Sequence, residues 1–231
     1  MRLDKFLSTS GIGTRSEVKK YIKKGIVKVN NEIIKDDGYI IDENVDRVVY
    51  NNQEVTYQKY HYYMLNKPAG YVTSTKDKEV TVMSLIKEFP KFKLSPVGRL
   101  DKDTEGLLII TDDGELIHEL TSPKKHIPKT YYVETLESIT NNDVKMLEEG
   151  VTLDDGYQTL PSEIIKKNDR IIYLTIYEGK YHQVKRMLEA INNKVTYLKR
   201  VKMNNLELDE TLKKGEYRQL SNEELKQLMK S

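Results

Sequence analysis

One aspartate stands out among the residues that could carry out chemistry. Asp101 lies in the charged loop Gly-Arg-Leu-Asp-Lys-Asp-Thr-Glu-Gly at 98–106, which runs into the apolar segment 107–110. A carboxylate presented by such a loop can act as a covalent nucleophile or as a general base. The alternative is that Asp101 is a turn or capping residue, which is the commoner role of an aspartate beside a strand. Asp101 is therefore a candidate whose role depends on the rest of the chain.

Other common catalytic constellations are missing from the sequence. The chain has no cysteine, so it has neither a thiolate nucleophile nor a disulfide framework. Its four histidines, at 61, 118, 126 and 182, do not have metal-ligand spacings such as His-Glu-x-x-His, and no P-loop or dinucleotide-binding glycine motif occurs. We therefore expect a protein of the cytoplasm that uses no metal and no cofactor.

Three further segments accompany the Asp101 loop in a fixed order. They are Leu-Asn-Lys-Pro-Ala-Gly-Tyr-Val at 65–72, Lys-Thr-Tyr-Tyr-Val at 129–133, and Glu-Gly-Lys-Tyr-His-Gln-Val-Lys-Arg-Met at 178–187. Together with the loop at 98–106, these motifs resemble the pseudouridine synthases of the ribosomal small-subunit type. A short match such as Gly-Arg-Leu-Asp is weak by itself, but four motifs in sequence are specific, and the resemblance covers nearly the whole chain.

The resemblance implies an isomerisation of uridine in RNA. The N-glycosidic bond breaks, the uracil turns within the pocket, and it is rejoined to the ribose through C5, which requires no cofactor. By resemblance, Asp101 is the covalent catalyst. Whether it attacks C1′ of the ribose or C6 of the base, or whether the reaction passes through a glycal, is left open by the sequence.

The resemblance also implies roles for four other residues. Lys185 is the basic partner of the catalytic carboxylate, Tyr131 lies against the flipped base, and Arg99 fills the space that the flipped nucleotide leaves or holds its phosphate. Arg186, next to Lys185, is a candidate RNA contact. In the alternative interpretation, Lys185 and Arg186 form the exposed side of an amphipathic helix, and Tyr131 is one strand tyrosine among sixteen. Lys67, in the first motif, is expected to be structural.

The charge of the chain is concentrated at its N-terminus. The formal net charge of the whole chain is only +2, but residues 1–30 hold eight basic and two acidic side chains, whereas residues 31–58 hold two basic and seven acidic ones. The Thr-Arg-Ser-Glu sequence at 14–17 is a capping box and predicts a helix that begins at Arg15. Val18, Tyr21 and Ile22 then form the buried face, and lysines occupy the other faces.

This N-terminal segment resembles the small alpha-L RNA-binding module named after a small-subunit ribosomal protein, the S4 domain. The resemblance implies that two helices contact the backbone of a folded RNA, which positions a protein without selecting a base. The alternative is that the lysines are merely a solvated face. The candidate RNA-binding residues are Arg2, Lys5, Arg15, Lys19, Lys20, Lys23 and Lys24.

The order of predicted elements indicates an α+β fold. Strands are predicted at 26–29, 32–34, 48–50, 54–55, 61–65, 107–111, 131–136, 171–177 and 195–200, and helices at 82–88, 115–121, 142–149 and 182–191 and after the capping box at 221–224. Strands and helices do not alternate regularly, which argues against a doubly wound sheet. We expect an S4-like RNA-binding domain at 1–58, followed at 59–231 by a pseudouridine synthase domain with a mixed, largely antiparallel sheet.

Three functional hypotheses remain. The leading one is a synthase for small-subunit rRNA, which by resemblance acts on uridine 516 in the usual rRNA numbering. It rests on the Tyr-His-Gln sequence at 181–183, where large-subunit relatives more often have Asn-Arg, and on the short C-terminus. The second is the same reaction on large-subunit rRNA, and the third is a ribosome-assembly factor without required activity. The expected partner is small-subunit rRNA or a partly assembled small subunit. We expect a monomer with no membrane association.

Overall fold

The computed structural model describes residues 1–89 and 92–230, and the chain divides into two compact units. The first unit contains residues 1–61 and the described residues of the segment 88–93, where the ring of Phe92 stacks on His61. The second unit contains residues 62–87 and the described residues from 94 onward. No helix among the described residues has the length and apolar character needed to cross a membrane.

Two short helices and a small sheet make up the first unit. Its elements are α1 (Leu3–Thr9), α2 (Arg15–Lys23), β1 (Val27–Val29), β2 (Glu32–Ile33), β3 (Val48–Tyr50) and β4 (Gln53–Glu54), and its sheet order is β2-β1-β3-β4. The capping box is present, since the Thr14 side chain accepts a hydrogen bond from the backbone N–H of Glu17. Val18 and Ile22 are buried in one cluster with residues of α1 and β1. The predicted helix start and buried face are thus confirmed.

A long mixed sheet is the frame of the second unit. Its order is β13-β5-β7-β11-β8-β10-β9, with β6 paired to β7 and β12 paired to β11. The strands are β5 (Tyr62–Lys67), β6 (Ser95–Pro96), β7 (Glu105–Thr111), β8 (Lys129–Thr135), β9 (Glu163–Asn168), β10 (Ile171–Ile176), β11 (Val195–Met203), β12 (Leu206–Glu207) and β13 (Tyr217–Gln219). Only β7 and β11 pair in parallel among the strands described, so the predicted mixed, largely antiparallel sheet is confirmed.

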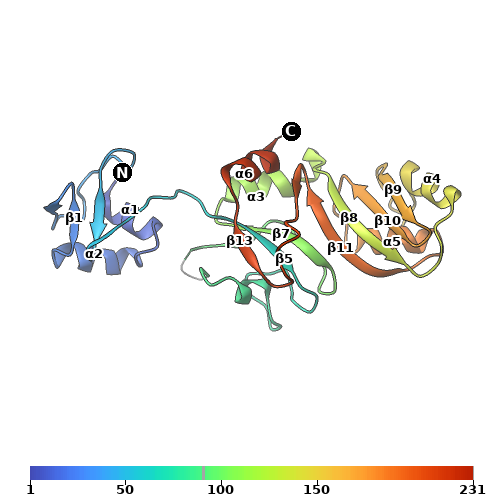
Figure 1. Ribbon diagram of the computed structural model, residues 1–231, viewed down its shortest axis with the longest axis horizontal. Coiled ribbons are helices and arrows are strands. Elements are labelled where there is room, and N and C mark those ends of the chain that lie inside the picture. The colour runs from blue at the N-terminus through green and yellow to red at the C-terminus, as the bar shows by residue number, and fades with distance from the viewer. Residues whose placement is uncertain (90–91, 231) are drawn as a thin grey trace. The chain divides into compact units, whose positions relative to one another are not determined.

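Helices cover the two halves of this sheet (Figure 1). They are the 3₁₀ helices η1 (Val82–Leu85) and η2 (Pro123–Lys125) and the α-helices α3 (Gly114–Thr121), α4 (Asn141–Glu149), α5 (Gln183–Ala190) and α6 (Asn222–Met229). Leu116 and Leu120 of α3 and Leu228 of α6 are buried with Met64 and Leu107 of the sheet. On the other half, α4 contacts β9 and α5 contacts β11. This packing holds α5 against β11, the strand that pairs in parallel with β7.

Several elements differ from the sequence-based expectation. The elements α1, η2, β6, β12 and β13 are absent from the predicted ranges, and two further differences concern η1 and β9. The helix predicted at 82–88 is a single 3₁₀ turn over Val82–Leu85, because the backbone at Ile86 is already extended. The strand β9 was not predicted, because it is a mostly exposed edge strand with no apolar alternation. Neither difference alters the elements that carry the candidate catalytic residues.

One glycine permits the parallel pairing at the middle of the sheet. Gly106 of β7 has φ +100° and is the register partner of Arg200 on β11. A Cβ atom at this position would lie 2.2 Å from the Arg200 carbonyl oxygen. Only glycine therefore allows β7 and β11 to approach this closely, and the loop that precedes β7 is placed by this contact.

Candidate active site

The loop that carries Asp101 connects β6 to β7 and is held at several points. Val97 N–H bonds to the Ile109 carbonyl at 2.8 Å, which closes the hairpin below the loop. Leu100 is buried, and its backbone exchanges hydrogen bonds of 2.8 and 3.2 Å with the Thr73 hydroxyl. The Thr104 N–H then bonds to the Asp101 carbonyl at 3.1 Å and forms a turn. The backbone at Asp101 is therefore fixed before any substrate binds.

A buried lysine ties this loop to β5. Lys67 is fully buried, and its Nζ lies 3.0 Å from the Asp101 carbonyl oxygen, 3.3 Å from that of Lys102 and 2.7 Å from that of Thr104. Burial lowers the pKa of Lys67 to about 8, although the charges of Asp103, Asp101 and Glu105 oppose this shift. Lys67 thus holds the loop in place through these backbone carbonyls, which is a structural role of the kind expected for it.

The side chain of Asp101 meets a cation from α5. Lys185 Nζ lies 3.2 Å from Asp101 Oδ2 and 2.6 Å from Asp103 Oδ1. Burial acts to lower the pKa of Lys185, but its hydrogen bonds and charge interactions with the two aspartates outweigh burial and raise it. Lys185 therefore remains an ammonium at neutral pH and forms an ion pair with Asp101.

Two neighbours of this pair were not predicted from the sequence. Asp103 is the second acceptor of Lys185, and hydrogen bonding to that ammonium overcomes burial and lowers the pKa of Asp103. His182 Nε2 lies 3.6 Å from Asp101 Oδ1. His182 has φ +49° just before α5, and its ring stacks on that of Tyr181. The motif 178–187 contains both aromatic residues, but its spacing does not indicate which of them faces Asp101.

Asp101, His182 and Lys185 line a cavity of 590 Å³ in the second unit. Its lining includes the Asp101 loop, residues of β8 and β11, and the segment 176–185 before and within α5. A volume of this size suits a small-molecule group such as one nucleoside. A second hollow of 690 Å³, lined by residues such as Glu134, Asp169 and Thr196, contains none of the predicted catalytic residues.

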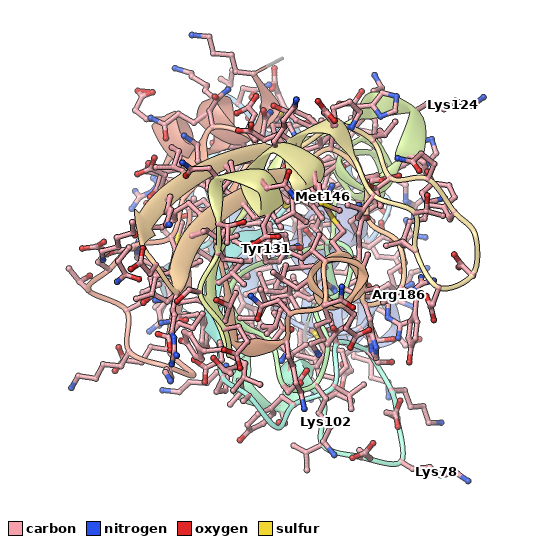
Figure 2. All side chains as sticks on the ribbon, turned by 90° about the vertical axis from the view of Figure 1, so that its right-hand side faces the viewer. Lys78, Lys102, Lys124, Tyr131, Met146 and Arg186 are labelled. Carbon is pink, nitrogen blue, oxygen red and sulfur yellow. The ribbon has the colours of Figure 1, made fainter. Side chains whose placement is uncertain are left out.

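Tyr131 lines the same cavity from β8. It is 8% exposed, and Figure 2 shows it among the strands of the second unit, whereas Lys78 and Lys124 lie at the outer margin. In the pairing of β8 with β11 it lies opposite Arg200. A buried tyrosine ring at the wall of the cavity offers an apolar face on which a planar base can stack.

The two predicted arginines lie in different settings. Arg99 is exposed at the cavity and has no ion pair or hydrogen bond of its side chain within residues 1–89 and 92–230. Arg186 is absent from the cavity lining. Its guanidinium pairs with Asp154, and with Asp155 at 2.7 Å. An RNA contact by Arg186 would have to compete with these two carboxylates.

The predicted basic residues of the first unit fall into two groups. Arg2 and Lys19 lie near the buried Asp4 and near Asp37, at N–O distances of 3.1–3.8 Å, and the hydrogen bond from Arg2 lowers the pKa of Asp4. The other five are exposed and form no ion pair with any described residue: Lys5, Arg15, Lys20, Lys23 and Lys24. These five leave an uncompensated positive surface on α1 and α2.

Known proteins similar to this chain are RNA-modifying enzymes. A family model described as RNA pseudouridylate synthase matches residues 61–190, and a model of the S4 domain matches residues 1–46. An uncharacterized RNA pseudouridine synthase of Bacillus subtilis is 47% identical over 97% of both chains. The ribosomal small subunit pseudouridine synthase A of Haemophilus influenzae is 40% identical over the full length of both.

A solved structure is similar over the same extent. A crystal structure of a pseudouridylate synthase covers 99% of this chain and 99% of its own, with a TM-score of 0.71 and 40% sequence identity. The ribosomal small subunit pseudouridine synthase A of Vibrio vulnificus is also 42% identical over the full length of both chains. The similarity therefore extends over both units.

Proposed function

Since the chain belongs to the RNA pseudouridine synthase family and carries an S4 domain, we propose that it isomerises one uridine of small-subunit rRNA. The observation that supports this reaction is the ion pair of Asp101 and Lys185, which faces a cavity of nucleoside size beside Tyr131. The choice of small-subunit rRNA is supported by full-length relatives of that name and by the sequence 181–183. The proposed target is uridine 516 in the usual rRNA numbering.

In the proposed mechanism, Asp101 is the covalent catalyst. A flipped uridine enters the cavity, where the carboxylate forms a bond to C1′ of the ribose or C6 of the base, or assists a glycal route. The N1–C1′ bond breaks and the uracil turns. C5 then bonds to C1′ as any bond to Asp101 breaks and the carboxylate is released. The proton on C5 is lost, and N1 gains a proton. Atoms are conserved, since substrate and product are isomers, and no water enters the product.

Lys185 has the proposed role of keeping Asp101 ionised and correctly directed. Bound RNA excludes water from the cavity, and desolvation disfavours a carboxylate unless a cation is close. Lys185 provides this cation at 3.2 Å. Asp103 Oδ1 lies 2.6 Å from the same ammonium. Lys185 is therefore positioned by two acceptors and does not depend on Asp101 alone.

The other cavity residues have proposed roles in binding the flipped nucleotide. The Tyr131 ring lies against the uracil, and its hydroxyl can move a proton during isomerisation. The exposed guanidinium of Arg99 fills the space vacated in the RNA or holds the phosphate of the flipped nucleotide. Flipping costs a few kcal/mol, and such an insertion offsets part of that cost. Arg186 is proposed to contact RNA only outside the cavity.

Residues 1–58 are proposed to bind folded RNA, and residues 59–231 to carry out catalysis. The five exposed cations of the first unit suit phosphate contacts, which hold an RNA without reading its sequence. In this proposal Arg2 and Lys19 contribute less, because Asp4 and Asp37 already balance their charge. The proposed partner is small-subunit rRNA or a partly assembled small subunit. We propose that the protein acts on it as a monomer in the cytoplasm.

Two alternatives lead to different experimental results. The same reaction on large-subunit rRNA would leave the cavity chemistry unchanged, and an assembly factor would need only the RNA-binding unit. The test is to map pseudouridines in the rRNA of cells with and without this gene. We expect one small-subunit pseudouridine to disappear. A lost site in large-subunit rRNA would support the first alternative, and an unchanged map with defective ribosome assembly would support the second.

A further inference from the structure

An uncompensated guanidinium lies at the inner end of the candidate active site. Arg200 of β11 lines the cavity, yet it is only 1% exposed. Its Nε donates to the Leu107 carbonyl at 2.8 Å, and this is the only hydrogen bond of its side chain within the described part of the chain. Its Nη2 is buried without a partner. Leaving a buried charged donor unpaired is costly, so such a group calls for an explanation.

The sheet places Arg200 directly beside Tyr131. The two residues are register partners in the antiparallel pair of β11 and β8, and side chains of directly opposed residues project from the same face of a sheet. Arg200, at 1% exposed, is more deeply buried than Tyr131, at 8%, and both are less exposed than the side chain of Asp101. A base that stacks on Tyr131 would therefore lie next to Arg200.

No described carboxylate forms an ion pair with Arg200. Lys129 also lines the cavity, and burial, together with the charge of Arg200, lowers its pKa to about 8. Glu178 is buried nearby, but its oxygens already accept from Leu160 N–H, Gln183 Nε2 and the Tyr157 hydroxyl at 2.7–3.0 Å. Among the described residues, the inner end of the cavity thus has an excess of positive charge.

We propose that Arg200 binds a carbonyl oxygen of the uracil ring and stabilises the negative charge that this ring acquires during isomerisation. This inference rests on the proposed function. When the N1–C1′ bond breaks, its electron pair stays on the uracil while C1′ bonds to the Asp101 carboxylate or becomes part of a glycal. If Asp101 attacks C6 instead, the electrons move to a ring oxygen. In every route the ring oxygens become more negative.

A buried guanidinium is suited to this task and not to holding the RNA backbone. It only donates hydrogen bonds, it cannot lose its charge, and a preorganised donor in a dry site stabilises a developing charge strongly. The phosphates stay on the strand at the entrance of the cavity, where Arg99 is exposed. Arg200 is thus assigned to the base, and Lys185 to the catalytic carboxylate.

The test compares two substrates with the variants Arg200→Gln and Arg200→Lys in the full-length enzyme. One RNA fragment carries uridine at the target position and the other carries 5-fluorouridine, whose electron-withdrawing fluorine already stabilises a negative ring. Single-turnover consumption of the target nucleoside, RNA affinity and melting temperature are measured for each protein. The exposed Arg170→Gln serves as the matched control outside the cavity.

We expect Arg200→Gln to slow consumption of uridine by about 10²–10³-fold, the usual effect of losing one preorganised donor to a developing anion. RNA affinity should change by only a few-fold. The loss on 5-fluorouridine should be at least about tenfold smaller, because fluorine partly replaces the missing stabilisation. Arg200→Lys, which keeps the charge, should fall between wild type and Arg200→Gln, and it provides the same comparison if Arg200→Gln unfolds.

A structural role for Arg200 would give a different pattern. Equal losses on both substrates in a folded variant, or a wild-type rate on uridine, would overturn the proposal. If the wild-type enzyme modifies large-subunit RNA and leaves small-subunit RNA unmodified, the proposed substrate is wrong. The Arg200 comparison then uses the RNA that is modified, so failures of the two proposals are distinguishable.

Discussion

At the scale of single residues, Asp101 bears the proposed covalent chemistry, and phosphate contacts elsewhere supply most of the RNA affinity. We therefore predict that Asp101→Asn abolishes isomerisation while RNA affinity changes by only a few-fold. Tritium release from RNA with uridine labelled at C5 measures the first effect, and a filter-binding titration measures the second. Substantial turnover by a folded Asp101→Asn protein would mean that another group carries the reaction.

Lys185 should influence the rate more than the affinity. It contacts Asp101 and Asp103, so Lys185→Met removes the cation that pairs with both carboxylates. A carboxylate without its cation gains a proton at higher pH, so the acid limb of the pH–rate profile should shift upward. Lys185→Arg keeps the charge and should be milder. An unchanged rate and acid limb in Lys185→Met would remove Lys185 from the mechanism.

The residues of the site were predictable to different degrees. The resemblance implied catalytic roles for Asp101, Lys185 and Tyr131. In the structure, all three line one cavity. Asp103 as a second acceptor of Lys185 could not be predicted, because the loop at 98–106 contains several acids and spacing does not reveal which of them faces α5. The burial of Arg200 could not be predicted either. It lies between other basic residues in its strand, and such an arginine is expected to be exposed.

At the scale of elements, the contact between β7 and β11 places the catalytic loop against α5 and the strand beside it. Gly106→Ala would force a Cβ atom against the Arg200 backbone and impose strain at φ +100°. We predict a loss of about 3 kcal/mol in the free energy of unfolding, measured by urea denaturation. Gly114→Ala is the matched control, because its Cβ meets no atom within 4 Å, and its stability should hardly change.

Periodicity and capping predicted most helices and strands, but not those set by tertiary contacts. The helix starting at Arg15 and the strands at 107–111 and 171–177 have strong local signals, and each is present with ends shifted by at most two residues. In contrast, β9 has no apolar alternation, is mostly exposed, and is held in the sheet by its pairing with β10.

At the scale of the whole molecule, the basic surface of the first unit should determine how RNA binding depends on salt. Changing Lys20, Lys23 and Lys24 together to alanine removes three exposed cations. If each contacts a phosphate, the slope of log affinity against log salt should become less steep by roughly 0.7–0.9 per lysine. The rate at saturating RNA should change less. Alanine at the exposed Lys145 and Lys226 is the control, and an equal slope in both variants would mean that the surface is only solvated.

The most direct measurement is to incubate the purified enzyme separately with unmodified small-subunit and large-subunit rRNA. Pseudouridine is then mapped by reverse-transcription stops after carbodiimide treatment. Since a base must leave its stack to reach Asp101, naked or partly assembled small-subunit RNA should react well and finished subunits poorly. We predict a single strong stop in small-subunit rRNA that is absent with Asp101→Asn. A single strong stop in large-subunit rRNA, with none in small-subunit rRNA, would contradict the proposed function.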